Sequence, residues 1–70
     1  MNVLSGFSER LAELMSDNSF NTLSLEKATG FSSSNISKWL KCKKAPNLNT
    51  LMVLSDVFDC SIDYLTGRSD

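Results

Sequence analysis

Histidine is absent from this chain of 70 residues, and cysteine and proline are scarce. Without histidine the commonest general acid or base is missing, so a hydrolytic triad or histidine-based proton transfer cannot come from this chain alone. The two cysteines, Cys42 and Cys60, are too few for a zinc site, and we expect both to be reduced thiols. The sequence therefore predicts no catalytic residue, no metal site and no cofactor.

Long apolar stretches are also missing, and none approaches the ~20 residues that a membrane-spanning helix needs. The first ten residues, MNVLSGFSER, lack the basic start and continuous apolar block of a secretory signal. A composition of 41% hydrophobic and 21% charged residues is that of a globular protein of one small core. We therefore expect a single cytoplasmic domain over residues 1–70, with no membrane partner and no small-molecule ligand.

Basic residues are concentrated in one short stretch, although the formal net charge is −1. Four of the seven fall within seven positions: Lys38, Lys41, Lys43 and Lys44. The acidic residues of the first helix and of the last third of the chain lie elsewhere in the sequence: Glu9, Glu13, Asp17, Asp56, Asp59, Asp63 and Asp70. Because a phosphate backbone responds to charge within a Debye length of ~8 Å, the local cluster favours DNA binding in spite of the acidic total.

The spacing of apolar residues predicts short helices and no strand. The first helix, over about 8–17, has Ser5 or Ser8 as its N-cap and buries one face. That face consists of Phe7, Leu11, Leu14 and Met15. The second helix, over about 22–28, begins after Asn21 or at Thr22 and ends before Gly30, where a left-handed turn needs a residue without Cβ. Its inward residues are Leu25 and Ala28.

A third helix, over about 33–41 with Ser32 as its cap, has two different faces. Its apolar side carries Ile36, Trp39 and Leu40, and its polar side carries Ser34, Ser37, Lys38 and Lys41. After Pro46, a fourth helix begins at Asn47 or Asn49. One side of it holds Leu48, Leu51, Met52, Ser55 and Phe58. The segment SIDYLTGR predicts a short fifth helix that is capped by Ser61, buries Ile62 and Leu65 and closes on Gly67.

Three segments in register resemble the Cro/repressor-type helix-turn-helix family, also called the XRE family of bacterial and phage regulators. They are LEKATGFSSSNISKW, KCKKAP and NLNTLMVLSDVFDCSIDYLTGR, and the resemblance covers about 7–68. Its most specific parts are the interval from Gly30 to Ile36 and Trp39, the proline at Pro46, and the ending DYLTGR. The resemblance implies an all-α, compact five-helix, lambda-repressor-like domain. Its helix-turn-helix covers about 22–41, and its third helix enters the DNA major groove.

The resemblance also implies a function: sequence-specific binding of double-stranded DNA by a transcriptional regulator, a repressor, as a homodimer on half-sites ~34 Å apart. The positions that match the family's base contacts are Ser33, Ser34, Ser37 and Lys38. Those that match phosphate contacts are Asn21, Thr22, Asn35, Lys41 and Lys43, and Lys44 adds to the field. Lys38 would favour guanine, whereas serine hydroxyls discriminate little between bases, and the three serines could also be no more than a solvated cap. The candidate dimer residues are Val53, Val57, Ile62 and Tyr64.

The sequence departs from the family pattern at three places. Glu26 stands where a small residue is usual, and we expect its carboxylate to be exposed and the crossing of the two helices to be slightly wider. Cys42 replaces the glycine that usually ends the third helix, so either the backbone is left-handed and strained by ~1 kcal/mol, or the helix runs one turn further. Met15 and Leu40 match an arginine–glutamate pair, and we expect them to pack together instead.

The acidic pI, the short serines and Glu26 leave a second interpretation open: an antitoxin-like protein-interaction module that keeps the fold but binds DNA weakly. DNA selection would separate the two. The sequence also leaves open whether the chain is complete or the N-terminal part of a longer repressor.

Overall fold

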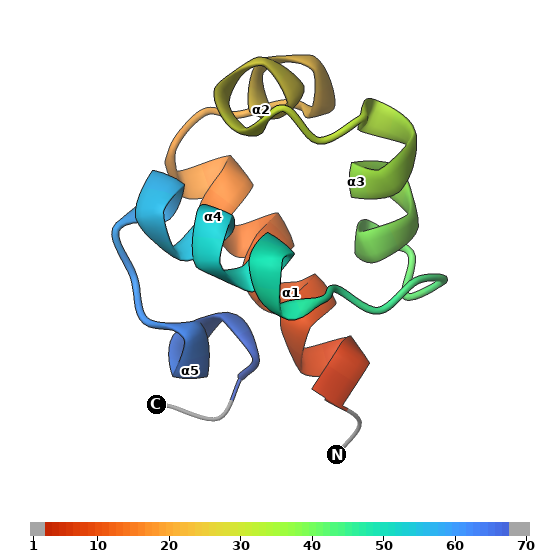
Figure 1. Ribbon diagram of the computed structural model, residues 1–70, viewed down its shortest axis with the longest axis vertical. Helices are drawn as coiled ribbons and strands as arrows, with labels where there is room; N and C mark the ends of the chain where they lie inside the picture. Colours follow the sequence, from red (N-terminus) through yellow and green to blue (C-terminus); the bar gives the residue numbers. More distant parts are fainter. Residues whose placement is uncertain (1–2, 68–70) are drawn as a thin grey trace.

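The computed structural model describes residues 3–67. Within this range the chain forms five α-helices and no strand (Figure 1). They are α1 (Val3–Asp17), α2 (Thr22–Thr29), α3 (Ser33–Leu40), α4 (Leu48–Phe58) and α5 (Ile62–Leu65). In Figure 1, α4 lies in front of α1 at the centre, while α2, α3 and α5 surround this pair. The predicted all-α, five-helix fold is confirmed.

One apolar cluster joins all five helices. The predicted face of α1 is confirmed, because its four apolar residues are buried: Phe7, Leu11, Leu14 and Met15. The other helices add Leu25, Ile36, Trp39, Leu54, Phe58 and Leu65. Burial of each large apolar side chain stabilises the fold by about 1.5–3 kcal/mol, so this cluster holds α2 and α3 in place against α1.

The start of α1 differs from the prediction, because the helix begins at Val3 and not near residue 8. Ser5 and Ser8 lie inside the helix, so the prediction that either is the N-cap is wrong. The Ser8 side chain is buried, and its hydroxyl donates a hydrogen bond to the backbone carbonyl of Trp39 near the end of α3. Its oxygen thus serves a contact between two helices.

Gly6 lets Thr66 and Gly67 pack closely on α1. A Cβ on Gly6 would lie 2.8 Å from the carbonyl oxygen of Thr66, and one on Gly67 would lie 3.2 Å from the Cα of Gly6. Gly67 also has a φ of 76°, which disfavours a side chain there. The two glycines therefore allow Thr66 and Gly67, which follow α5, to lie against the first turns of α1.

Replacing Gly6 by alanine should destabilise the domain by about 1 kcal/mol. Alanine gains about 1 kcal/mol of helix propensity, but forcing a methyl group into backbone costs about 1–3 kcal/mol. Urea denaturation followed by circular dichroism measures the difference. Ser16→Ala, an exposed change in the same helix, is the control and should be neutral or stabilising. Equal stabilisation by both changes would contradict the close approach.

The buried side of α4 is rotated relative to the prediction. Leu48 and Met52 are 66% and 52% exposed, whereas Thr50, Leu54 and Phe58 are buried. Thr50 tolerates burial because its hydroxyl donates to Oδ1 of Asn47, 3.0 Å away. The same oxygen accepts from the Thr50 amide, so Asn47, one of the two predicted starts, is the N-cap of α4 and Asn49 is not. The predicted face of Leu48, Leu51, Met52, Ser55 and Phe58 is therefore wrong for Leu48 and Met52.

The last helix is held against α1. Ser61 caps α5, as predicted, by accepting a hydrogen bond from the Tyr64 amide, and Leu65 is buried. The guanidinium of Arg10 lies over the Tyr64 ring, 4.6 Å from its centroid, so a cation–π contact adds to the apolar packing. The four candidate dimer residues are all half-buried: Val53, Val57, Ile62 and Tyr64. Ile62 is thus less buried than predicted.

Candidate nucleic-acid interface

The first element of the interface, α2, begins with a capping box. Oδ1 of Asn21 accepts from the Ser24 amide at 2.8 Å, and Oγ of Ser24 accepts from the Asn21 amide at 2.9 Å. This places the side-chain amide of exposed Asn21 and the half-buried Thr22 at the N-terminus of α2, where helix amides lack intrahelical acceptors. Leu25 is buried as predicted, but Ala28 is exposed, so its predicted inward position is wrong.

The turn between α2 and α3 is short and internally bonded. Gly30 has a φ of 81°, as the sequence predicted, and its amide donates to the carbonyl of Glu26 at 2.8 Å. After it, the Phe31 ring meets Trp39 edge-on at a centroid distance of 5.3 Å. The aromatic contact anchors the turn to the buried side of α3, so the opposite side of α3 is left for solvent.

The prediction that the Glu26 carboxylate is exposed is wrong. It is half-buried, and its Oε1 accepts a hydrogen bond of 2.6 Å from the backbone amide of Ser33, the first residue of α3. A carboxylate is favoured at this point because the N-terminus of a helix carries a partial positive charge of about half a unit. The partner is thus a backbone group on the next helix, which a residue pattern does not reveal.

The third helix separates its two faces as predicted. Ile36 and Trp39 are buried, and Leu40 packs on the core. Ser32 caps the helix by accepting from the Asn35 amide at 3.2 Å. The residues toward solvent are exposed Ser34, Lys38 and Lys41, together with half-buried Ser33, Asn35 and Ser37.

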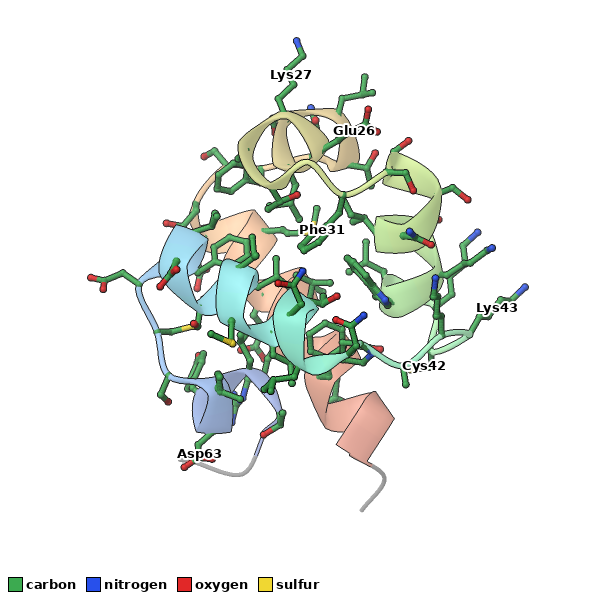
Figure 2. All side chains as sticks on the ribbon, in the orientation of Figure 1. Glu26, Lys27, Phe31, Cys42, Lys43 and Asp63 are labelled. Atoms are coloured by element: carbon green, nitrogen blue, oxygen red, sulfur yellow. The ribbon has the colours of Figure 1, made fainter. Side chains whose placement is uncertain are left out.

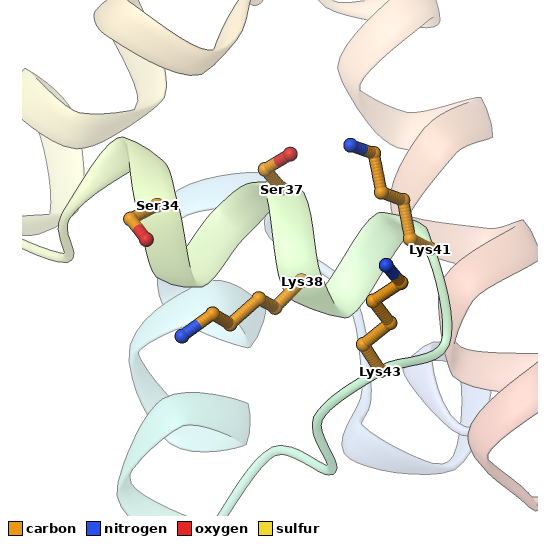
Figure 3. Close-up of a pocket in the computed structure, with 5 residues that line it drawn as sticks. All are labelled: Ser34, Ser37, Lys38, Lys41 and Lys43. Carbon is orange, nitrogen blue, oxygen red and sulfur yellow. The ribbon is translucent and has the colours of Figure 1, made fainter.

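Five of the predicted contact residues line one open hollow of about 290 Å³ (Figure 3). They are Ser34, Ser37, Lys38, Lys41 and Lys43. Figure 3 shows the two serines and Lys38 along α3, with Lys41 and Lys43 at its end and in the following loop. The structure thus brings three predicted base-contact residues together with two predicted phosphate-contact residues. With three lysines and two hydroxyls, the hollow suits an anionic ligand with polar edges.

Lys44 is held away from this hollow by a contact of its own. Its Nζ donates to Oδ1 of Asn35 at 2.9 Å, which ties the loop after α3 back onto the exposed side of the helix. These two predicted phosphate-contact residues therefore lie together. The structure does not bring Asn21, Thr22 or Ser33 into the hollow.

The end of α3 settles the alternatives for Cys42. Its φ is 59°, so the backbone is left-handed and the helix does not run a turn further. The Cys42 amide donates to Trp39 O at 3.3 Å and the Lys43 amide to Lys38 O at 2.8 Å, which is a Schellman ending. The Cys42 thiol also donates to Oγ of Ser8 at 3.1 Å. This ending turns the chain so that Lys43 joins Lys38 and Lys41.

Replacing Cys42 by glycine should therefore stabilise the domain, by about 0.5 kcal/mol. Relief of the left-handed strain is worth ~1 kcal/mol, from which the weak contact between the thiol and Ser8 must be subtracted. Thermal unfolding measures the change. The matched control is Cys42→Ala, which loses the thiol but keeps Cβ and should be no more stable than the original chain. A glycine variant less stable than the original chain would show that the thiol contact outweighs the strain, and one less stable than the alanine variant would show that the left-handed strain of Cβ is negligible here.

Met15 and Leu40 both belong to the apolar cluster, in place of a charged pair. Their direct contact stays a prediction. Both cysteines are free thiols, as expected, and burial with the neighbouring Asp59 carboxylate raises the pKa of Cys60. Residues 3–67 hold no group of three or more side chains suited to a metal ion, and no helix in that range is long and apolar enough to cross a membrane.

The comparison with known protein families matches residues 10–68 to the Cro/C1-type HTH DNA-binding domain. No match is found among curated proteins or among solved structures. The matched range contains the capped α2, the Gly30 turn, the exposed side of α3 with its hollow, and α4 and α5. It covers far more than half of the 70 residues and agrees with the resemblance in the sequence. The chain belongs to the Cro/C1-type helix-turn-helix family of DNA-binding domains.

Proposed function

We propose that this chain is a bacterial or phage transcriptional repressor that binds a specific double-stranded DNA site with α3 in the major groove. The observation that carries the proposal is the hollow on the exposed side of α3, where three lysines and two serines converge in a chain of a DNA-binding family. In such a helix-turn-helix the second helix reads base edges while the first crosses the backbone. We assign this DNA binding to residues 1–70 as one domain and place it in the cytoplasm.

We assign two different roles to the residues in and around the hollow. Lys38 would donate to the O6 and N7 acceptors of guanine, with the hydroxyls of Ser33, Ser34 and Ser37 beside it. Phosphates would be held by the remaining predicted residues: Asn21, Thr22, Asn35, Lys41, Lys43 and Lys44. Phosphate contacts fix the position of α3 on the duplex, and base contacts supply the sequence preference.

The protein would bind as a homodimer. A helix of eight residues is only about 12 Å long and reaches few base pairs, so a second copy on a half-site ~34 Å away would supply the remaining specificity. Because the four candidate dimer residues are half-buried, the exposed apolar residues Leu48 and Met52 of α4 replace them as candidates for the contact between copies.

Selection from a random duplex library with the purified chain tests this function. We expect an enriched site with two symmetric half-sites about one helical turn apart, and a complex that contains two chains per duplex. Binding should weaken steeply as salt is raised, because lysine–phosphate contacts release counterions. Failure to enrich any site at any salt concentration would contradict the proposal and favour the antitoxin-like protein-interaction module.

A further inference from the structure

We propose that Glu26 is a positioning residue that fills the N-terminus of α3 with the protein's own negative charge and so keeps DNA phosphates away from that end. This inference rests on the proposed function, because it assigns a role within the same DNA-binding surface. The observation behind it is the hydrogen bond of 2.6 Å between Oε1 of Glu26 and the Ser33 amide.

Three of the first four amides of α3 have acceptors. Glu26 takes the Ser33 amide, the Ser32 hydroxyl oxygen takes the Asn35 amide at 3.2 Å, and the Ser32 carbonyl takes the Ile36 amide at 3.0 Å. Figure 2 shows Glu26 on the side of α2 toward α3, whereas Lys27 points away. The backbone of Glu26 is fixed at the end of α2, because the Gly30 amide donates to the Glu26 backbone carbonyl. The carboxylate therefore occupies the place that a bound anion would take.

Within residues 3–67, the positive group that Glu26 contacts is the N-terminus of α3. Among residues 3–67 the ion pair that forms is Arg10–Glu13, so no basic side chain neutralises Glu26. The N-terminus of a helix is a ready anion site, with about half a positive charge and free amides. Once the Glu26 carboxylate occupies it, the Ser33 amide is no longer free for a phosphate, the partial positive charge is offset, and a phosphate meets a like charge within the ~8 Å Debye length.

The result is a helix with opposite electrostatic ends. Glu26 lies at the N-terminus of α3, and Lys38, Lys41 and Lys43 surround its C-terminal part. Phosphates are thereby directed away from the Ser33 amide, toward the lysine end and toward the Asn35 side chain that Lys44 contacts, and the Ser33 and Ser34 hydroxyls stay available for base edges. Such an arrangement lowers binding to arbitrary DNA, because one half of the recognition helix repels a misplaced backbone.

Titration with inorganic phosphate tests the filled anion site without DNA. In Glu26→Ala the amide NMR signal of Ser33, which lies outside the lysine hollow, should shift on addition of phosphate, whereas in the original chain and in Glu26→Gln it should stay in place. The alanine variant should fold, since the family prefers a small residue at this crossing. Equal shifts in the original chain, or none in the folded alanine variant, would overturn the proposal.

DNA binding tests the consequence. Glu26→Gln keeps a side-chain acceptor for Ser33 and removes the charge, so affinity for an arbitrary duplex should rise roughly threefold at low salt and the gain should shrink as salt increases. The matched control is Asp63→Asn, the same charge change on α5, far from α3 in Figure 2, which should leave affinity unchanged. Equal effects of the two changes, or weaker binding by Glu26→Gln, would contradict the role of Glu26. Absence of DNA binding by the original chain would contradict the proposed function, and the phosphate titration would still decide the role of Glu26.

Discussion

Replacing Lys41 and Lys43 together by alanine should weaken binding to every duplex, by roughly 100-fold at low salt. Both side chains are exposed at the lysine end of α3 and line the same hollow, so each can donate to a phosphate oxygen. A charge-assisted hydrogen bond contributes about 1.5 kcal/mol, or tenfold in affinity, and two such contacts give the stated loss. Because neither side chain packs in the core, the stability of the fold should not change.

The salt dependence of affinity identifies the cause. If each lysine neutralises one phosphate, the slope of log affinity against log salt should fall by about two units in the double variant. Lys27→Ala is the control, since Lys27 is exposed on α2 and points away from α3 (Figure 2). Lys38→Ala should differ in kind, because it should also relax the base preference of the selected site. An unchanged slope in the double variant would place the phosphate contacts elsewhere.

The helix starts that could be predicted are those with a local signal. Asn21, Ser32, Asn47 and Ser61 each accept the amide three residues later, so the cap and the amide that it serves lie next to each other in the sequence. Such a contact depends on a few neighbouring residues, and the residue types favour it strongly. The positions of α2, α3, α4 and α5 follow from these caps.

The errors concern contacts between distant residues. Ser8 has the residue type of a cap, but its hydroxyl binds the carbonyl of Trp39, which lies 31 positions away. In α4, apolar residues occupy more than one side. The side that is buried is the one with Leu54, because Leu54 packs completely into the cluster formed by the other helices. Periodicity alone does not decide between two apolar faces.

In the candidate interface, too, features set by neighbouring residues could be predicted and contacts between separate helices could not. The lysines after α3 form a patch because their neighbours in sequence remain neighbours in space, and the Schellman ending at Cys42 only adds Lys43 to it. Glu26 could not be placed from the sequence, because its partner is the backbone amide of Ser33 and every residue except proline has such an amide. A side-chain pattern therefore predicts where charge gathers better than it predicts which helix ends are filled.

Replacing Trp39 by alanine should leave the domain largely unfolded. Trp39 is 3% exposed and joins α3 to the core, where Phe7 and Phe31 meet its ring edge-on at 6.4 and 5.3 Å. Loss of a buried tryptophan costs about 3–5 kcal/mol. At about 0.05–0.15 kcal/mol per residue, the whole domain has only about 4–10 kcal/mol of stability. Urea denaturation followed by circular dichroism measures the loss, and DNA binding should disappear with the fold.

Replacing Trp39 by phenylalanine should destabilise the domain far less, by about 1 kcal/mol, because phenylalanine has no indole nitrogen that is buried without a hydrogen-bond partner. Within the described part of the chain, Nε1 of Trp39 is buried without a hydrogen-bond partner, and an unpaired buried donor costs about 1–3 kcal/mol. Phenylalanine leaves a cavity where the indole was larger, but it keeps an aromatic ring between Phe7 and Phe31. The cost of the cavity exceeds the gain from removing the unpaired donor by only about 1 kcal/mol. If Trp39→Phe proved as damaging as Trp39→Ala, the full indole shape, and not an apolar ring of about the right size, would be what holds α3 against α1.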